Sequence, residues 1–153
     1  MSDPRSVSVR PAEDDDAVEI AGLVAMLAAE LGDPTAVTPA YVADYLHRPG
    51  CHALLVVRPP EVLGLLSYSS RPSLYHAADS CLLDELIVQP AERNCGVGTL
   101  LLNEVNRLAR EQGCAALLPA AWLRGSGVAP RAAPPYCLEM NHTGGGARWH
   151  PPV

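Results

Sequence analysis

The sequence predicts an α/β fold: a mixed sheet with helices on both faces, formed by a single domain over residues 1–153. Two observations support it. Residues 13–32 and 96–113 have apolar side chains at helical spacing, and shorter strand-like stretches separate and follow them. The stretch "CLLDELIV" at residues 81–88 is almost continuously apolar, which is typical of a central strand that is covered on both faces.

The N-terminal part predicts a strand followed by a helix. In "SVSVRPA", residues 6–12, apolar and polar residues alternate up to a proline, as in a short strand. Residues 13–32 then read as a helix, because Asp14–Asp16 supply candidate N-caps and Gly32 supplies a C-terminal stop. The residues expected on its buried face are Ile20, Leu23, Val24, Leu27 and Leu31.

A second, shorter helix and two strands are expected next. In "TPAYVADYLHRPG", residues 38–50, Thr38 is a candidate N-cap and a proline occupies the first helical position. Residues 51–60 and 62–70 are both rich in aliphatic residues, and a proline-rich turn at 59–61 joins them. This part of the chain therefore predicts a hairpin after the helix.

The C-terminal half has one strong helix and weaker signals after it. Residues 96–113 form the helix, with Gly113 at its end, and residues 114–122 read as another strand. Beyond Trp122 the chain is rich in glycine and proline; a weak helix is expected from about Arg131, and a short strand within 143–152. The residues expected on the buried face of the strong helix are Val97, Leu100, Leu101, Val105, Leu108 and Ala109.

Charge and cysteine content exclude several kinds of protein. The net charge of −6 and the pI near 5.2 argue against nucleic acid as the main partner. The five cysteines are far apart and form neither a zinc-binding spacing nor a disulfide framework, so no metal is expected. Without a signal peptide or an apolar run long enough to cross a bilayer, the expected location is the cytoplasm, away from membranes.

The stretch "RNCGVG", residues 93–98, lies where a strand gives way to a helix. It is not a dinucleotide-binding fingerprint, because Leu101 stands where the third glycine is needed, and it is not a P-loop, because no Lys-Ser or Lys-Thr pair follows. Two interpretations remain. The loop either directs main-chain N–H groups at an anion, helped by the helix dipole, or is only a tight turn between two elements.

The segment "LLDELIVQPAERNCGVGTLLLNEV", residues 82–105, resembles the acetyl-CoA pyrophosphate loop of the GCN5-related N-acetyltransferase (GNAT) superfamily. That family has a Gln/Arg-x-x-Gly-x-Gly/Ala motif that follows a central strand and opens a helix. The stretch "VSVRPAEDDDAVEIAGLV" is similar to its first strand and helix, and the order of elements matches from about Val7 to Leu118. The resemblance implies a mostly antiparallel sheet whose central strand splays away from its neighbour.

The resemblance also implies which residues bind the cosubstrate, acetyl-CoA. Main-chain amides of the loop would hold the diphosphate, and main-chain groups at the end of the central strand would bind the pantetheine arm. Asn94 and Cys95 replace the basic residues that are usual between the arginine and the first glycine. The expected binding residues are Leu86, Ile87, Val88, Arg93, Asn94, Cys95, Gly96, Val97, Gly98 and Thr99.

Two acidic residues occupy the strand positions at which many members carry the catalytic base. Asp84 and Glu85 are neighbours, and regular alternation would let only one of them face the acceptor cleft. For the general acid, the family has a tyrosine in a helical Phe-Tyr-x-x-x-Gly-Phe pattern, and "YCLEMNH" is the nearest match here. Tyr136, Cys137 in the tyrosine position, or no acid at all are the three alternatives, and Tyr136 is the preferred one.

The function implied by the resemblance is transfer of an acetyl group from acetyl-CoA to a primary amine of a small molecule or peptide. A non-catalytic acyl-CoA-binding module of the same fold is the alternative. Homodimers are common in the superfamily, so a homodimer is among the expected assemblies. The acidic balance of the chain favours a cationic acceptor only slightly.

Overall fold

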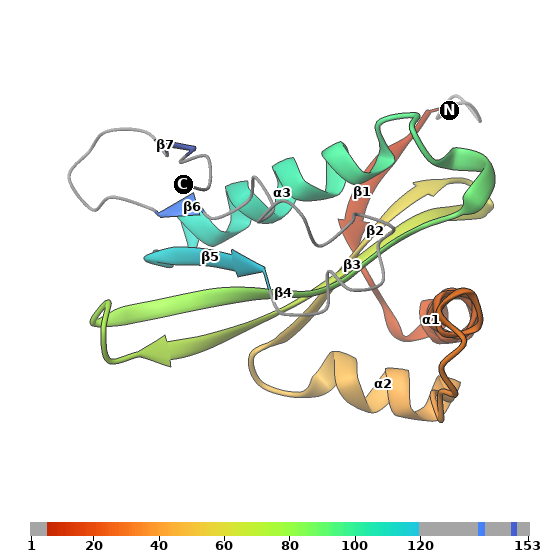
Figure 1. Ribbon diagram of the computed structural model, residues 1–153, viewed down its shortest axis with the longest axis horizontal. Coiled ribbons are helices and arrows are strands. Elements are labelled where there is room, and N and C mark those ends of the chain that lie inside the picture. The colour runs from red at the N-terminus through yellow and green to blue at the C-terminus, as the bar shows by residue number, and fades with distance from the viewer. Residues whose placement is uncertain (1–5, 120–137, 140–147, 150–153) are drawn as a thin grey trace.

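The computed structural model describes residues 6–119, 138–139 and 148–149 (Figure 1). In these residues one sheet of seven strands is present, and its spatial order follows the chain order from β1 to β7. All neighbouring strands are antiparallel except β4 and β5, which are parallel. The strands are β1 (Ser8–Pro11), β2 (Cys51–Arg58), β3 (Glu61–Ser73), β4 (Ala78–Val88), β5 (Ala116–Pro119), β6 (Leu138–Glu139) and β7 (Arg148–Trp149).

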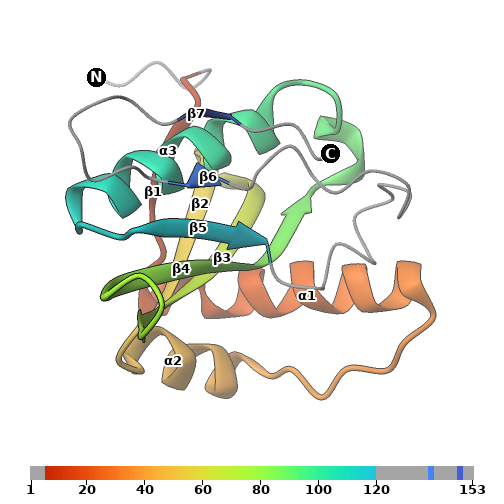
Figure 2. The same cartoon turned by 60° about the vertical axis from the view of Figure 1, so that its left-hand side comes forward.

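Helices cover both faces of this sheet, as the sequence predicts. Helices α1 and α2 lie on one face and α3 lies on the other (Figures 1 and 2). The helices are α1 (Ala17–Leu31), α2 (Pro39–His47) and α3 (Val97–Glu111), and the 3-10 turns η1 (Asp14–Asp16) and η2 (Pro90–Glu92) precede α1 and α3. None of the described helices is long and apolar enough to cross a membrane.

The helix ends follow the sequence signals in most places. Gly32 ends α1 with φ 70°, and the side chain of Thr38 accepts a hydrogen bond from the Tyr41 N–H at the start of α2. Asp16 occupies the N-cap position of α1 but makes no side-chain cap. Its carboxylate instead accepts hydrogen bonds from the Arg10 guanidinium at 2.7 and 2.8 Å and from the Glu13 N–H at 2.8 Å.

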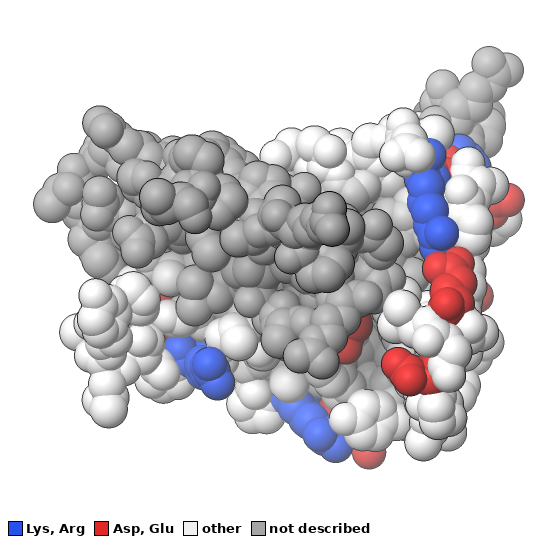
Figure 3. All heavy atoms as spheres, viewed as in Figure 1, with Lys and Arg blue, Asp and Glu red and all other residues white. Residues whose placement is uncertain are grey.

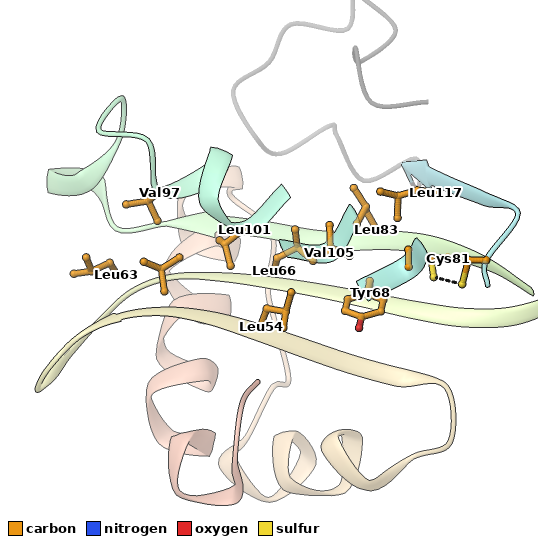
Figure 4. Packing of buried hydrophobic residues seen from close by; sticks show 13 residues of the cluster. Leu54, Leu63, Leu66, Tyr68, Cys81, Leu83, Val97, Leu101, Val105 and Leu117 are labelled. Carbon is orange, nitrogen blue, oxygen red and sulfur yellow. Dashed lines mark hydrogen bonds between the residues drawn. The ribbon is translucent and has the colours of Figure 1, made fainter. Parts of the chain in front are cut away.

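Two hydrophobic cores lie on opposite faces of the sheet. On the α3 side, Val97, Leu101 and Val105 point toward the sheet and pack on residues of β2 to β5 (Figure 4). On the other side, α1 and α2 pack on β2, β3 and β4 through a separate cluster that includes Ile20 and Leu55. The predicted helix faces were slightly too wide, because Leu31 and Leu100, near the ends of α1 and α3, are 43% and 42% exposed.

The end of the chain differs from the sequence prediction in one respect. The weak helix expected after Arg131 is wrong at Leu138–Glu139, which form strand β6 and pair with Ala116 and Leu117 of β5. An open edge of β5 would leave main-chain N–H and C=O groups unpaired, and pairing satisfies them. The short strand predicted within 143–152 is present as β7, and the preceding residues 120–137 lie outside the described residues.

Candidate active site

Strand β4 has an irregularity in its pairing with β3. Opposite β3, Ser67 pairs with Glu85 and Tyr68 pairs with Leu83, so Asp84 is an extra residue in a β-bulge. On the other side, β5 pairs only with Ser80–Leu83. Within the described part of the chain, the remainder of β4 up to Val88 therefore has no partner strand on its β5 side. The family resemblance implies that β4 splays away from its neighbour here, and this stays a prediction, because residues 120–137, which follow β5, lie outside the described residues.

The bulge also breaks the alternation expected of Asp84 and Glu85. The pKa of each carboxyl is affected by a serine of β3, Glu85 by Ser67 and Asp84 by Ser69. Ser67 and Ser69 are two residues apart on one strand, so they share the face that is covered by α1 and α2. Of the two acids, Glu85 lines the cavity between the sheet and the two helices, and Asp84 is not among its described lining residues. The expectation that only one of them faces the acceptor cleft stays a prediction.

Ser67 and Tyr45 lie near Glu85, and all three residues line one cavity. The Ser67 hydroxyl accepts a hydrogen bond from the Glu85 N–H at 3.0 Å and donates one to the Glu85 carboxylate. The Tyr45 hydroxyl donates to the His52 carbonyl at 3.4 Å. Burial, together with the negative charges of Asp84 and Glu85, raises the pKa of Tyr45, so its phenol stays protonated.

The electrostatic environment raises the pKa of both acids. Loss of water around Glu85 raises the pKa of its carboxyl, the hydrogen bond from Ser67 opposes this, and the charge of Asp84 adds to it. Burial likewise raises the pKa of Asp84, against the effects of Ser69 and Arg71. A carboxyl group with a raised pKa that remains accessible to a ligand is suited to accept a proton near neutral pH.

A cavity of about 390 Å³ opens beside Glu85, between the sheet and the two helices α1 and α2. Among the described residues, its polar lining consists of Thr35, Ser67, Glu85 and the two tyrosines Tyr41 and Tyr45. Glu85 is accessible to solvent from this cavity although protein surrounds it on several sides. The remaining lining residues are Ile20, Val24, Ala36, Val37, Val42, Leu46, Ala53 and Leu65.

The glycine loop lies at the start of α3, as predicted. Asn94 and Gly96 have φ of 62° and 88°, and Gly96 is the N-cap of the helix. The first hydrogen bond into the helix comes from the Leu100 N–H to the Gly96 carbonyl, so the earlier main-chain N–H groups of the first turn face outward. Except for the buried Val97 and the half-buried Gly98, residues 93–99 are exposed.

The loop has room for an anionic group. A side-chain carbon added at Gly96 would meet no atom within 4 Å, and one added at Gly98 would meet only Leu86 Cδ2 at 4.0 Å. Open space next to outward-facing N–H groups and a helix N-terminus fits a diphosphate. Of the ten expected binding residues, this geometry brings the loop residues 94–99 together and places Leu86, Ile87 and Val88 at the end of β4, just before the loop.

Arg93 has a different position from the one expected of a phosphate ligand. Its guanidinium donates to both carboxylate oxygens of Glu30, at 2.8 and 2.9 Å, and its Nε donates to the Val88 carbonyl at 3.2 Å. Figure 3 shows basic and acidic side chains in contact along this edge, where Figure 1 has α1 and the segment before α3. The side chain of Arg93 therefore fastens the loop to α1 and β4.

Some candidate residues lie outside the described part of the chain, and others were not anticipated. Tyr136 and Cys137, the candidate general acids, are outside it. Ser67 and Glu30 carried no signal in the sequence, since serine in a strand and glutamate near a helix end are common. Among the described residues, no group of three or more His, Cys, Asp or Glu side chains could hold a metal ion.

Comparison with known proteins finds a family model that covers most of the chain. The family model described as the acetyltransferase (GNAT) family matches residues 14–125. That range includes α1, the cavity, the bulge in β4, the glycine loop and α3. No curated protein is significantly similar to the chain in sequence.

Solved structures with the same fold come from several sources. Ribosomal-protein-alanine N-acetyltransferase from Brucella melitensis biovar Abortus 2308 is 22% identical with a TM-score of 0.66, over 76% of this chain and 80% of that one. A possible acetyltransferase from Clostridium difficile 630 is 17% identical with a TM-score of 0.68, over 75% and 79%. An aminoglycoside acetyltransferase from an uncultured soil metagenomic sample is 19% identical with a TM-score of 0.64, over 76% and 80%.

Proposed function

Because the chain belongs to the acetyltransferase (GNAT) family, we propose that it transfers an acetyl group from acetyl-CoA to a primary amine of a small molecule or peptide. The observation that carries the proposal is the position of Glu85. This acid faces a cavity large enough for a small acceptor, and it lies beside the bulge in β4. An amine in the cavity and a thioester along β4 would meet at this point.

In the proposal, acetyl-CoA binds along the end of β4 and over the start of α3. Main-chain groups of Leu86, Ile87 and Val88 bind the pantetheine arm as a neighbouring strand would. The N–H groups of residues 94–99 hold the diphosphate, and the helix dipole of α3 adds to the attraction. Arg93 keeps this loop in place through Glu30.

The reaction is a direct transfer. The lone pair of the neutral amine attacks the thioester carbonyl carbon, a C–N bond forms and the C–S bond breaks. The nitrogen gives up one proton, and Glu85 is the group that we assign to accept it, directly or through water, with Asp84 beside it. The sulfur leaves as a thiolate and takes up a proton, for which Tyr136 is our candidate donor.

Names of structural neighbours are consistent with an amine acceptor. Several neighbours have names that state an acceptor: one is called an acetyltransferase of a ribosomal-protein alanine, and others are called aminoglycoside acetyltransferases. Both kinds of name refer to acceptors with amino groups, one on a protein and one on a small molecule. An amine is therefore the acceptor class that we propose for this chain.

The test is release of free thiol from acetyl-CoA in the presence of a panel of amines. We expect turnover with at least one amine, and we expect Glu85→Gln to lower kcat by about a hundredfold or more, since general-base catalysis contributes that much. Glu19→Gln, an exposed position on α1, is the matched control and should leave kcat unchanged. Binding of CoA without turnover on any amine would instead favour the non-catalytic module.

A second variant tests the diphosphate site. Gly96→Val puts a side chain into the space next to the loop amides, so we expect CoA affinity to be lost. Because φ at Gly96 is 88°, valine is also strained there, and the matched control is Gly113→Val, at φ 73° with equally open surroundings at the far end of α3. Unchanged CoA affinity in a folded Gly96→Val protein would contradict the assignment.

A further inference from the structure

The side chains and charges that line the cavity beside Glu85 indicate a narrower class of acceptor. We propose that the acceptor is a monoamine with an apolar substituent, which places its nitrogen at Glu85 and its substituent between α1 and α2. This inference rests on the proposed function and deepens it. It excludes polyamines and aminoglycosides as good acceptors for this chain.

The walls of the cavity are the first reason. Eight of the thirteen described residues that line it are aliphatic, and they come from α1, the loop after it, α2, β2 and β3. Two more, Tyr41 and Tyr45, contribute aromatic rings. An alkyl or aryl group in such a space gains free energy by leaving water, whereas a charged or heavily hydroxylated group loses hydrogen bonds that these walls do not replace.

The position of the charges is the second reason. Glu85 is the single carboxylate among the described lining residues, and it stands at the β4 end of the cavity. Asp84, its neighbour in the bulge, adds to the negative charge at that same end. Asp44, the acidic residue of α2, is exposed and does not line the cavity. One ammonium group is therefore matched, and a second one further along the ligand would have to give up its hydration among aliphatic side chains.

The rim of the cavity adds to this discrimination. Tyr41, which is half exposed, lines the cavity, and the guanidinium of Arg48 lies over its ring at 5.2 Å from the centroid. A fixed positive charge at the rim repels a ligand that carries further ammonium groups outside the cavity. A monoamine whose nitrogen lies at Glu85 has no further ammonium group outside the cavity, so Arg48 does not repel it.

The experiment compares two amines of equal chain length, pentylamine and cadaverine, with acetyl-CoA as donor. Cadaverine differs from pentylamine only by its second amino group. We expect kcat/KM for pentylamine to exceed that for cadaverine by at least about tenfold, and kanamycin to be a still poorer acceptor. Calorimetric binding of the same amines to the CoA-loaded protein gives a readout that does not depend on turnover.

A pair of variants on α1 tests the cavity itself. Val24→Glu places a carboxylate in the apolar wall, so the ratio of kcat/KM for pentylamine to that for cadaverine should fall by at least about tenfold. Val18→Glu changes a residue of the same helix that is 66% exposed and does not line the cavity, so it should leave the ratio unchanged. Equal effects of the two variants would overturn the proposal.

The outcomes separate this inference from the proposed function. Acetyl transfer to cadaverine or kanamycin as efficient as to pentylamine would overturn the inference and leave the proposed function in place. Absence of transfer to every amine, with pentylamine binding more tightly than cadaverine, would overturn the proposed function and support the preference of the cavity. Absence of both transfer and binding would overturn both.

Discussion

The hydroxyl group of Ser67 makes two hydrogen bonds to Glu85, accepting one from its main-chain N–H at 3.0 Å and donating one to its carboxylate. The two residues face each other across β3 and β4 at the bulge. A donor to a carboxylate stabilises the ionised form, which counteracts the loss of water around it. Ser67 therefore positions the proposed base and keeps it able to accept a proton.

We expect Ser67→Ala to lower kcat/KM at neutral pH by about tenfold, because a hydrogen bond to a charged group is worth roughly that much. The acidic limb of the pH profile should also move to higher pH, which a merely structural defect would not do. Ser69→Ala is the informative comparison, because Ser69 acts on Asp84 and not on Glu85. If Ser69→Ala produced the larger shift of the profile, Asp84 would be the base.

The pH dependence of the wild-type protein follows from the same pKa. Burial raises the pKa of Glu85, so kcat/KM should rise as pH increases through that raised value, where the proposed base loses its proton. Stability changes in the opposite direction. The folded state holds this proton more tightly than the unfolded state, so the contribution of Glu85 to stability decreases as pH rises through the same window.

That dependence is measured by initial rates and by urea unfolding at a series of pH values. Glu85→Gln removes the titrating group and should flatten the part of the stability curve that Glu85 causes. Glu19→Gln serves again as the control on an exposed helical site. A wild-type rate profile that falls with increasing pH over the acidic range would contradict the assignment of Glu85 as the base.

Loss of the ion pair between Arg93 and Glu30 should weaken acetyl-CoA binding while it hardly changes the stability of the fold. The pair is partly exposed, so Glu30→Gln should change the free energy of unfolding by less than about 1 kcal/mol. The glycine loop loses its attachment to α1, and we expect KM for acetyl-CoA to rise by about threefold. Glu104→Gln disrupts a comparable surface pair on α3 and should leave KM unchanged. A large loss of stability in Glu30→Gln would show that the pair supports the fold instead.

Most of the architecture could be predicted from local patterns. The apolar periodicity of α1 and α3, the Thr38 cap and the Gly32 stop depend on residues close together in the chain, and each of them is present. The glycine loop was predicted at the start of α3 for the same reason. The helix expected after Arg131 failed because its signals were weak, and pairing with β5 decides the structure of Leu138–Glu139.

The arrangement of the site could be predicted only in part. Asp84 and Glu85 were recognised as candidates, but a bulge depends on how β4 is registered against β3, and nothing near Asp84 in the sequence reports that register. Ser67 lies 18 residues before Glu85, and Glu30 lies 63 residues before Arg93. Contacts of this range depend on the completed fold, so single-residue signals do not reveal them.

Gly64 links the core to the glycine loop. An added side-chain carbon there would lie 2.8 Å from Val97 Cγ1 and 3.1 Å from the Ile87 carbonyl oxygen. Gly64→Ala should lower the free energy of unfolding by about 1–3 kcal/mol, as overpacking does. Because Val97 begins α3, the start of this helix should move outward and CoA affinity should fall as well.

Urea unfolding and CoA titration of the same Gly64→Ala sample measure both effects. The control is Gly22→Ala in α1, where an added carbon meets no atom within 4 Å. Alanine is the better helix former by about 1 kcal/mol, so this control should stabilise the protein slightly and leave CoA affinity unchanged. Normal stability of Gly64→Ala would mean that α3 lies further from β3 than in this structure.

The carboxylate of Asp16 ties the first strand to the first helix through Arg10, and it predicts an acid-sensitive component of stability. The hydrogen bonds from Arg10 lower the pKa of this buried carboxyl, so its stabilising effect is complete above the ordinary value near 3.8 and is lost as pH falls through the lowered one. We expect Asp16→Asn to reduce the free energy of unfolding by about 2 kcal/mol at pH 7. The difference between variant and wild type should shrink in strong acid, where the wild-type carboxyl is protonated. Asp15→Asn, at the exposed neighbouring position, should change stability little at either pH, and a similar loss in both variants would point to a general effect of charge near the start of α1.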